Sequence, residues 1–276
     1  MKRSVPASSM QRLQPRLVEK PWGRSALPAI FGAGGAVPIG EIWFESAAEK
    51  QLPLLVKYIF TSDRLSIQVH PDDTTAQAAG LPFGKEEIWY ILDCEPGATL
   101  GIGLKQPMTP QAFRAAALDG SIEEMIDWKP VKPGDCYFIP AGTVHAIGAG
   151  IVLAEIQQNA DVTYRLYDYG RPRELHLDQG LAVSILEPYR RPAVHAPLGT
   201  QDAILTPADA PFRLTLHQWD AGVVALPAAE QIWFTPLDGH GAIDGASWTK
   251  GDCWLLDGGC RLEAMAPTSA LIATLA

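Results

Sequence analysis

Two polar side chains that can bind a metal occur close together in the segment LSIQVHPDD, residues 65–73. Apolar residues alternate with polar ones here, which is typical of a β-strand. Gln68 and His70 are two residues apart, so on a strand their side chains point to the same side. Pro71 ends the strand directly afterwards. The pattern suggests that an amide and an imidazole face one shared partner.

Two further segments supply residues of the same chemical kind. Glu87 lies in GKEEIWY and His145 in PAGTVHAIG, where the PAG turn directs the histidine inward. Each residue taken singly has an ordinary structural explanation. Together, two imidazoles, one carboxylate and one amide oxygen suit a borderline divalent ion such as Zn²⁺. The sequence therefore predicts a metal site made by Gln68, His70, Glu87 and His145, without the thiolates of a zinc finger.

The elements that must position these residues are mostly short strands. Strand chemistry, with breaks at Gly, Pro or Asp, predicts strands at 40–46, 52–60, 64–70, 87–93, 98–104 and 134–140. Two short helices separated near Gly120 are predicted within 109–128, with Thr109 as the N-cap, and another helix around 174–184. Residues 1 to about 15 are expected to form a frayed arm. Many short strands favour a barrel or a sandwich, and a small open barrel can hold a metal and a small ligand.

The strand pattern is repeated near the end of the chain. VKPGDCYFIPAG (131–142) resembles TKGDCWLLDGG (249–259), at an offset of 251 − 134 = 117 residues, and EIWYIL (87–92) resembles QIWFTP (231–236). The chemical residues are not repeated. Leu262 stands 117 residues after His145, and Gln231 matches Glu87. Two copies of one β-module, the second without the site, explain this pattern.

These repeats predict two domains. Residues 1–195 would form an N-terminal catalytic domain with a helical insert near 109–128, and residues 196–276 a C-terminal domain without a metal site. The segment 195–211, rich in Pro and Ala, would link them. Trp233, Trp254 and Leu255 are expected to pack the two modules together.

Composition excludes several classes of function. The 276 residues include 22 Lys and Arg against 31 Asp and Glu, a formal net charge of −9, which argues against non-specific nucleic-acid binding. A small anionic substrate remains possible, because a few cations in one pocket override the net charge locally. Four cysteines without a CxxC pair indicate buried free thiols. The sequence shows neither a secretory signal nor an apolar run of membrane length, so we expect a cytoplasmic protein without a membrane partner, either a monomer or a weak homodimer.

Four motifs in order resemble the type I mannose-6-phosphate isomerases, and most closely their short bacterial branch within the cupin superfamily. They are LSIQVHPDD, GKEEIWY, PAGTVHAIG and NADVTYRLYDYGR (159–171), and the resemblance begins at EKPWG (19–23). It implies a mainly β fold of two cupin-type β-barrels or jelly rolls, the second degenerate, with a few short helices. It also implies interconversion of mannose 6-phosphate and fructose 6-phosphate by metal-assisted proton transfer through an enediol(ate). One Zn²⁺ per chain would be held by Gln68, His70, Glu87 and His145.

The same resemblance implies further site residues. Arg165 matches the essential arginine of the family, and Glu155 in VLAEIQQ matches a pocket acid. Ile147 stands where the long members carry a tyrosine, so the sugar-facing wall differs from theirs. We expect catalytic roles for Arg165, Lys57 and Glu155, and substrate-binding roles for Ser66, Lys85 and Arg165.

Two other functions remain compatible with these residues. A cupin oxygenase would hold Fe²⁺ with two histidines and one carboxylate, which would leave Gln68 without a role. A non-catalytic regulator that binds a sugar or a metal would keep the ligands but would not need Arg165, Lys57 and Glu155 together.

Overall fold

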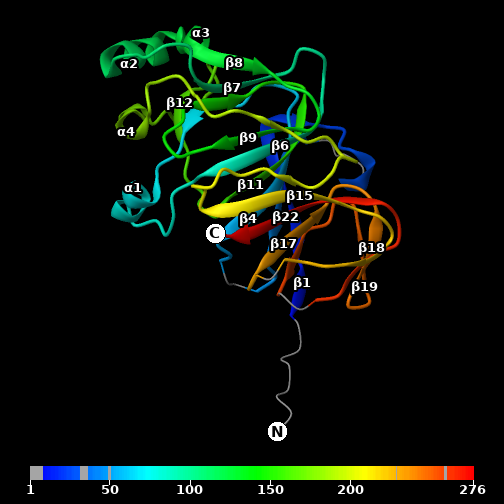
Figure 1. Ribbon diagram of the computed structural model, residues 1–276. Helices are drawn as coiled ribbons and strands as arrows, with labels where there is room; N and C mark the ends of the chain where they lie inside the picture. The colour runs from blue at the N-terminus through cyan, green and yellow to red at the C-terminus, as the bar shows by residue number, and fades with distance from the viewer. Residues whose placement is uncertain (1–8, 32–36, 49–50, 228, 258–259) are drawn as a thin grey trace.

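The computed structural model describes residues 9–31, 37–48, 51–227, 229–257 and 260–276. Within these ranges the chain is mainly β, with four antiparallel sheets that lie in layers (Figure 1). The fold class predicted from the sequence is therefore confirmed.

The first two sheets form the first barrel. The seven-stranded sheet has the order β13 (Val194–His195), β9 (Asp135–Ile139), β6 (Glu87–Cys94), β11 (Ile151–Gln158), β4 (Leu54–Phe60), β3 (Ile39–Glu45) and β2 (Gln14–Arg24). The five-stranded sheet has the order β12 (Tyr164–Tyr167), β5 (Ile67–Val69), β10 (His145–Ile147), β7 (Thr99–Leu104) and β8 (Ile126–Pro130).

The other two sheets form the second barrel. The six-stranded sheet has the order β1 (Met10–Arg12), β20 (Trp254–Leu256), β17 (Ile232–Pro236), β22 (Thr268–Leu275), β15 (Phe212–Trp219) and β14 (Ala203–Ile204). The four-stranded sheet has the order β16 (Gly222–Val224), β21 (Leu262–Ala264), β18 (His240–Ile243) and β19 (Ala246–Thr249).

The two middle layers pack back to back. A large apolar cluster combines residues of the seven-stranded sheet, such as Ile88 and Tyr90, with residues of the six-stranded sheet, such as Phe212 and Leu271. Trp89 and Ile91 lie in a separate cluster inside the first barrel. Because this sheet is covered on both faces, β6 is a nearly continuous apolar run rather than an alternating one.

Helices cover the outer face of the five-stranded sheet (Figure 1). They are α2 (Pro110–Asp119), α3 (Ile122–Met125) and α4 (Leu177–Val183). The hydroxyl of Thr109 accepts a hydrogen bond from Ala112 N at 3.2 Å, and Gly120 ends α2 with φ 88°, so the predicted cap and break are confirmed. The last residues of the predicted helical region form β8 instead.

One helix was missed. α1 (Asp73–Ala78) begins directly after the predicted strand, and the carboxylate of Asp72 caps it by accepting from Thr75 N at 2.8 Å. A short 3-10 helix spans Ala29–Phe31. None of the helices in the described ranges is long and apolar enough to cross a membrane.

The prediction of a frayed arm was wrong for residues 10–15. β1 pairs with β20 of the second barrel, and β2 then pairs with β3 of the first. Leu13, between them, is buried in the cluster that joins the two middle sheets. Residues 1–8 lie outside the described ranges. The chain start thus connects both barrels, and the division into domains 1–195 and 196–276 stays a prediction.

The repeated GDC segments form the same turn. Gly134 and Gly251 have φ values of 88° and 89°. In the first copy the carboxylate of Asp135 accepts from Lys132 N at 3.0 Å, and in the second that of Asp252 accepts from Thr249 N at 3.1 Å. The internal repeat seen in the sequence is therefore present in the structure.

Strand register corrects one detail of this repeat. At the offset of 117 residues, Ile139 of β9 corresponds to Leu256 of β20. Ile139 pairs with Glu87, whereas Leu256 pairs with Ile232. The residue at the place of Glu87 is therefore Ile232 and not Gln231.

The other predicted ligands are also replaced by apolar residues. His145 pairs with Gln68, and at the corresponding positions Leu262 pairs with Val224. Val224, Ile232 and Leu262 all belong to the apolar cluster inside the second barrel. Among the described residues, three of the four ligand positions of the first barrel thus correspond to core positions of the second.

The predicted contacts between the modules are confirmed for two of three residues. Trp233 and Leu255 belong to or pack against the cluster between the middle sheets. The prediction for Trp254 was wrong, because it lies in the cluster inside the second barrel. Successive side chains of a strand point to opposite faces, so neighbours on β20 cannot share one cluster.

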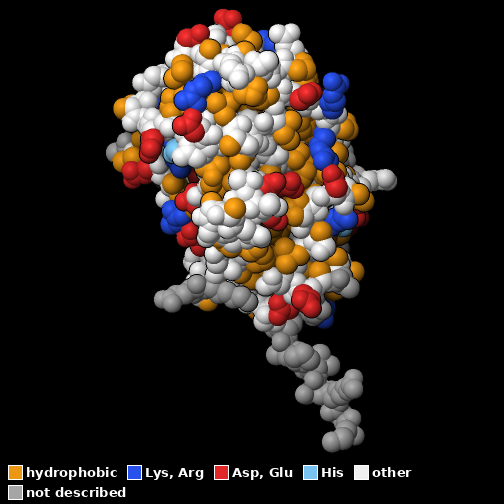
Figure 2. All heavy atoms as spheres, turned by 90° about the vertical axis from the view of Figure 1, so that its left-hand side faces the viewer, with side chains coloured by type: hydrophobic (Ala, Val, Ile, Leu, Met, Phe, Trp, Pro, Cys, Tyr) orange, Lys and Arg blue, Asp and Glu red, His pale blue; other side chains and the backbone are white. Residues whose placement is uncertain are grey.

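Two further features of the molecule are the distribution of charge on its surface and the burial of its cysteines. On the face shown in Figure 2, Lys and Arg side chains are interspersed with Asp and Glu rather than gathered by sign. Cys94, Cys136 and Cys253 are free thiols, and Cys136, Cys253 and Cys260 are buried.

Candidate active site

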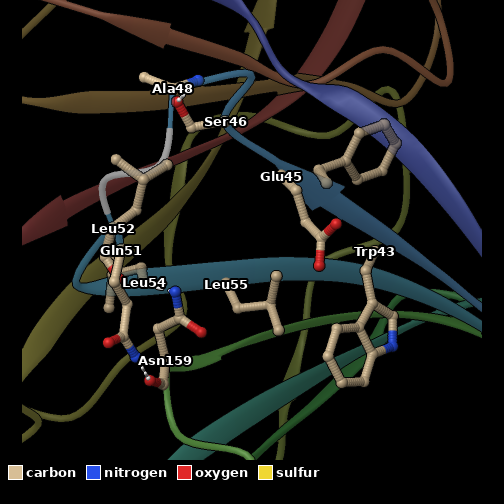
Figure 3. Close-up of a pocket in the computed structure, with 10 residues that line it drawn as sticks. Trp43, Glu45, Ser46, Ala48, Gln51, Leu52, Leu54, Leu55 and Asn159 are labelled. Atoms are coloured by element: carbon tan, nitrogen blue, oxygen red, sulfur yellow. Dashed lines mark hydrogen bonds between the residues drawn. The ribbon is translucent and has the colours of Figure 1, made fainter. Parts of the chain in front are cut away.

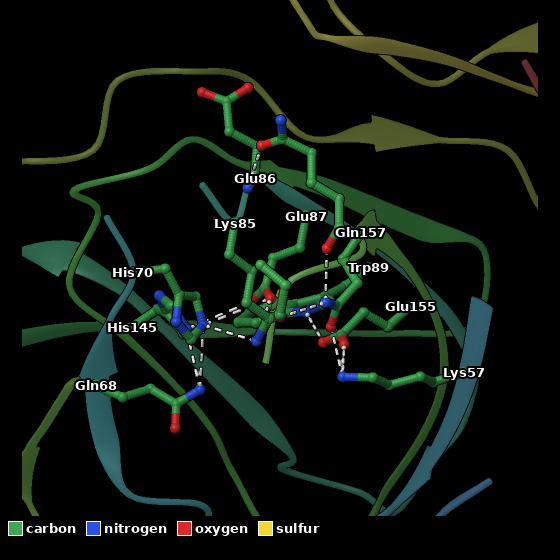
Figure 4. Close-up of polar contacts among 12 residues, drawn as sticks. Lys57, Gln68, His70, Lys85, Glu86, Glu87, Trp89, His145, Glu155 and Gln157 are labelled. Atoms are coloured by element: carbon green, nitrogen blue, oxygen red, sulfur yellow. Dashed lines mark hydrogen bonds and ion pairs between the residues drawn. The ribbon is translucent and has the colours of Figure 1, made fainter. Parts of the chain in front are cut away.

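The predicted ligands converge inside the first barrel because three strand ends meet there. Gln68 lies on β5 directly opposite His145 on β10, His70 follows β5, and Glu87 begins β6 on the facing sheet. Figure 4 shows their side chains pointing toward one another. The nearest ligand atoms of His70, Glu87 and His145 lie within 4.8 Å of one another, and all three residues are buried.

The distances describe a compact polar cluster. Glu87 Oε1 lies 3.3 Å from His145 Nε2, and Glu87 Oε2 lies 3.5 Å from His70 Nε2. The other ring nitrogen of His145, Nδ1, is 2.8 Å from the carbonyl oxygen of Thr143. Such a backbone partner fixes the ring and leaves Nε2 as the donor toward a metal.

The surroundings of the two histidines favour their neutral forms, which are the forms that can bind a metal. Burial lowers the pKa of His145 to about 4, although its hydrogen bond to Thr143 opposes this. Burial also lowers the pKa of His70 well below its usual value, and the nearby charge of Lys85 acts in the same direction. Both imidazoles are therefore neutral at neutral pH, as metal ligands must be. Burial raises the pKa of Glu87 to about 7, although Lys85 opposes the shift.

Gln68 is placed to join this cluster, but its amide is turned the other way. Its Nε2 lies 3.3 Å from His145 Nε2 and 3.5 Å from His70 Nε2. Its Oε1 accepts from the hydroxyl of Ser66 at 3.1 Å. Binding a metal through oxygen therefore requires rotation of the amide by about half a turn, since only the oxygen has a lone pair to offer.

Lys85 contacts the same two ligands from the cavity side. Its Nζ lies 3.0 Å from His70 Nε2 and 3.1 Å from Glu87 Oε2. An ammonium in this position neutralises the buried carboxylate and competes with a metal cation for both atoms.

A second buried network lies beside this cluster and involves two of the predicted residues. Lys57 donates to Glu155 Oε1 at 2.9 Å and to the side-chain oxygen of Gln157, and it lies 4.6 Å from the centre of the Trp43 ring. Trp89 Nε1 donates to the other oxygen of Glu155 at 3.0 Å. Lys57 is therefore occupied by protein partners, which suits it to hold Glu155 rather than to contact a phosphate directly.

The charge on Glu155 follows from this network. Burial alone would raise its pKa, but the charges of Lys57 and Lys85 and the hydrogen bonds from Lys57 and Trp89 lower the pKa to about 2. Glu155 is thus an ionised carboxylate at neutral pH.

One cavity joins the two networks. Its wall includes six residues predicted from the sequence, Lys57, Ser66, Gln68, Lys85, Glu155 and Arg165, and also Ile147. The other three predicted residues, His70, Glu87 and His145, do not line the cavity, and Gln68 and Lys85 lie between them and it. All nine predicted site residues are thus brought together in or beside this cavity.

Arg165 lies on β12 and is held by the backbone. Its Nη1 donates to the carbonyl oxygen of Glu174 at 2.8 Å, whereas its Nε is buried without a hydrogen-bond partner among the described residues. Asp168 is paired with Arg173 instead. Within the described ranges, Arg165 therefore forms no ion pair with Asp168 and keeps part of its guanidinium available to a ligand.

Sequence reasoning missed several residues of this region. Gln157 lies two residues after Glu155, so on a strand it shares the same face, and this spacing could have identified it. Lys20 and Glu41 line the cavity and face each other at 3.4 Å. Arg173 also lines the cavity, and no sequence pattern singled it out.

A second, separate cavity lies behind one wall of the first. It is lined by Trp43, Leu55 and Asn159 among others (Figure 3). Trp43 borders both cavities. In the second cavity the polar side chains are already engaged, since Glu45 pairs with Arg16 and Gln51 donates to the backbone of Asn159.

The sequence relatives of this chain are mannose-6-phosphate isomerases. No family model matches the chain. It is 33% identical over 228 residues to the mannose-6-phosphate isomerase of Streptococcus mutans, which covers 77% of this chain and 71% of that protein. It is 39% identical over 158 residues to the mannose-6-phosphate isomerase ManA of Bacillus subtilis, covering 52% of this chain and 50% of the relative.

Solved structures of mannose-6-phosphate isomerases share the fold of this chain over almost its whole length. The mannose 6-phosphate isomerase of Bacillus subtilis has a TM-score of 0.80 at 27% identity, covering 96% of this chain and 99% of that one. A variant of phosphomannose isomerase from Salmonella typhimurium has a TM-score of 0.76 at 15% identity, covering 97% and 99%, which at that identity supports the fold alone. On the sequence relatives and the shared fold, the chain belongs to the mannose-6-phosphate isomerase family.

Proposed function

We propose that this isomerase interconverts mannose 6-phosphate and fructose 6-phosphate with one Zn²⁺ per chain, held by Gln68, His70, Glu87 and His145. One observation carries the proposal. A buried cluster of two neutral imidazoles and a carboxylate adjoins a cavity whose wall contains Lys57, Lys85, Arg165 and Arg173. A sugar phosphate needs a metal ion near its C1 and C2 oxygens and positively charged side chains near its phosphate, and this arrangement offers both.

The reaction moves a proton between C1 and C2 of the open-chain sugar while negative charge develops on the neighbouring oxygens. A bound divalent ion would supply Lewis acidity for those oxygens. The arginines of the cavity wall, which keep N–H groups free, bind the phosphate and hold the chain extended, which removes much of the orientational cost. Apolar side chains on the wall, among them Leu65 and Ile147, limit the access of water.

The remaining predicted residues have defined tasks in this proposal. Lys57 keeps Glu155 ionised and oriented, so that Glu155 can accept a hydrogen bond from a hydroxyl of the sugar. Ser66 presents its hydroxyl at the cavity wall beside Gln68. Arg165 contributes a charged group with a free Nε, suited to charge that develops during the reaction.

A coupled assay on mannose 6-phosphate and fructose 6-phosphate, with and without a chelator, tests the proposal. We expect activity in both directions that is lost with the metal and regained with Zn²⁺. Elemental analysis should find about one zinc per chain. Full activity after exhaustive chelation would contradict the metal assignment, and oxygen uptake with bound iron would favour an oxygenase instead. The cytoplasmic location and the monomeric or weakly dimeric state stay predictions, and sedimentation equilibrium tests the latter.

A further inference from the structure

The turn after β12 folds one carboxylate back onto two arginines. Tyr169 and Gly170 both have positive φ values, 55° and 78°, and Arg171 N donates to the carbonyl oxygen of Asp168 at 3.0 Å. A left-handed backbone is unfavourable for a bulky residue such as tyrosine, so the surroundings must hold this turn in place. The turn brings the side chains of Arg171 and Arg173 to the carboxylate of Asp168.

Asp168 and Arg173 form a two-pronged ion pair. Arg173 Nε lies 2.6 Å from Asp168 Oδ2, and Arg173 Nη2 lies 2.6 Å from Asp168 Oδ1. Arg171 Nε approaches the same carboxylate at 3.6 Å. The carboxylate is almost fully buried, with 2% of its side chain exposed. Two guanidinium groups thus share this buried carboxylate, and Arg171 also lies 4.0 Å from the exposed carboxylate of Asp63.

Arg173 reaches the active-site cavity with part of its guanidinium outside this pair. It lines the cavity together with Arg165, Lys85 and Gln68. Its Nε and Nη2 are used by Asp168, which leaves Nη1 outside the ion pair. Arg165 adds a buried Nε without a partner among the described residues. Free guanidinium N–H groups on one wall of a cavity are suited to an anion.

We propose that Arg173 binds the phosphate group of the sugar phosphate, and that Asp168 is a positioning residue that holds Arg173 toward the cavity. The inference rests on the proposed function, since it assigns one end of the same substrate. The paired carboxylate fixes the plane of the guanidinium before substrate arrives, so less rotamer freedom is lost on binding. Asp168 is shared between Arg171 and Arg173, so it does not cancel the charge of Arg173 alone, and Arg173 keeps its attraction for a dianion.

Substitution of Arg173 gives the first test on the metal-loaded enzyme. Arg173→Ala should raise KM for mannose 6-phosphate by about 10- to 100-fold, the range for a lost hydrogen bond to a charged group, with kcat changed by less than about threefold. Inorganic phosphate should become a weaker competitive inhibitor by a similar factor. Arg173→Lys should resemble Arg173→Ala more than the wild type, because an ammonium cannot bridge Asp168 and the phosphate at once.

Asp168→Asn distinguishes a positioning role of Asp168 from the effect of its negative charge on phosphate binding. Removal of a negative charge should by Coulomb attraction alone improve phosphate binding and lower KM. If Asp168 positions Arg173, the same substitution raises KM by about 3- to 30-fold and weakens inhibition by inorganic phosphate. Asp209→Asn is the matched control, because Arg191 and Asp209 form a similar two-pronged pair outside this cavity, at 2.9 and 2.7 Å. It should leave KM unchanged.

Several outcomes would overturn the inference while leaving the isomerase function intact. An active Arg173→Ala enzyme with unchanged KM and unchanged phosphate inhibition would remove Arg173 from the substrate site. A lowered or unchanged KM in Asp168→Asn would reject the positioning role. Should Asp168→Asn fail to fold, judged by its melting curve, Arg173→Lys decides the question. Calorimetric binding of inorganic phosphate to wild type and Arg173→Ala does not depend on turnover, so it tests the anion site even if the proposed reaction is wrong.

Discussion

At the scale of single residues, Arg165 differs from the other cations of the cavity by having a buried nitrogen without a partner. Lys57, Lys85 and Arg173 each pair with a carboxylate. Arg165 instead donates one nitrogen to a backbone carbonyl and keeps Nε unpaired among the described residues. A buried N–H without a partner is costly in the free protein, and a group of the substrate or transition state can satisfy it.

We therefore expect Arg165→Ala to lower kcat by at least about 100-fold, the ~3 kcal/mol scale of a lost preorganised charge contact, while the metal stays bound. Arg165→Lys should recover little, because lysine cannot reproduce the planar donor group. Steady-state kinetics and elemental analysis check both variants. A variant with wild-type kcat and only a raised KM would make Arg165 a phosphate anchor, as is proposed for Arg173.

The two histidines should be required for metal and activity together. His145→Ala removes a ligand atom that lies 3.3 Å from Glu87 Oε1, and His70→Ala removes one at 3.5 Å from Glu87 Oε2. Loss of either should abolish both bound zinc and turnover. Zinc content and activity are measured on the same sample. His195→Ala is a suitable control, since the partly exposed His195 of β13 pairs with Asp135 of β9 away from the site, and the substitution should leave zinc content and activity unchanged. Retained stoichiometric zinc in either ligand variant would contradict the site.

At the scale of elements, strand register places the second network. Glu155 on β11 is directly opposite Lys57 on β4 and opposite Trp89 on β6. Cross-strand neighbours on one face are close enough to interact. Gln157, two residues further along β11, shares that face and fixes Lys57 from the other side. Its amide nitrogen donates to two carbonyl oxygens, at 2.8 and 3.1 Å, so its oxygen must point to the lysine.

Lys57→Met should destabilise the protein by about 3–5 kcal/mol, because it leaves a buried carboxylate unpaired. It should also change the dependence of stability on pH. The pKa of Glu155 is about 2 in the folded protein, well below the usual value of 4.5, so the stabilisation is present above about 4.5 and lost as the pH falls toward 2. This loss is on the order of 3 kcal/mol in the wild type.

In Lys57→Met this acid-dependent loss should disappear, since an unpaired buried carboxyl is neutral more readily. Urea unfolding of the metal-free proteins at several pH values measures the difference. Lys129→Met serves as the control, because Lys129 pairs with Asp127 in a partly exposed ion pair that should contribute at most about 1 kcal/mol. Equal acid dependence in wild type and Lys57→Met would show that Glu155 is not held by Lys57.

At the scale of the whole molecule, the second barrel supports the first through the middle layers. The residues of the second barrel that correspond to the predicted metal ligands of the first are apolar and buried. The apolar cluster between the middle sheets contains residues of both barrels. β1 joins the six-stranded sheet just before β2 joins the seven-stranded one. The second barrel is therefore expected to act as a scaffold without a metal.

Leu262→Ala tests this role. Leu262 is fully buried and corresponds to His145, so the substitution should cost about 2–5 kcal/mol of unfolding free energy and leave one metal per chain and kcat unchanged. Urea unfolding, elemental analysis and the coupled assay check the three quantities. Loss of turnover without loss of stability would mean that the second barrel takes part in catalysis.

The sequence by itself determined the fold class, the reaction class and the types of residue proposed to bind a metal. Its motifs contain the predicted ligands within a few residues of strand ends and turns, where local rules apply. Alternation placed Gln68 and His70 on one face, and Thr109 and Gly120 marked the ends of α2 through local backbone chemistry. The absence of the predicted ligands from the second copy was also visible in the sequence. The strand register shows that the residue corresponding to Glu87 is Ile232 rather than Gln231.

Only the tertiary structure decided which charged groups are partners. Lys57, Glu155 and Trp89 come from three strands, and their contacts depend on register, which local pattern does not specify when a sheet is buried on both faces. The same holds for β1, whose three residues form a strand because the edge of β20 is available to pair with them. Trp254 faced the opposite side from the one expected because each one-residue step along a strand reverses the face. Arg173 reached the cavity through a turn with a left-handed Tyr169 whose ring lies under the guanidinium of Arg64, a contact from outside its own segment, which is why composition and periodicity could not reveal it.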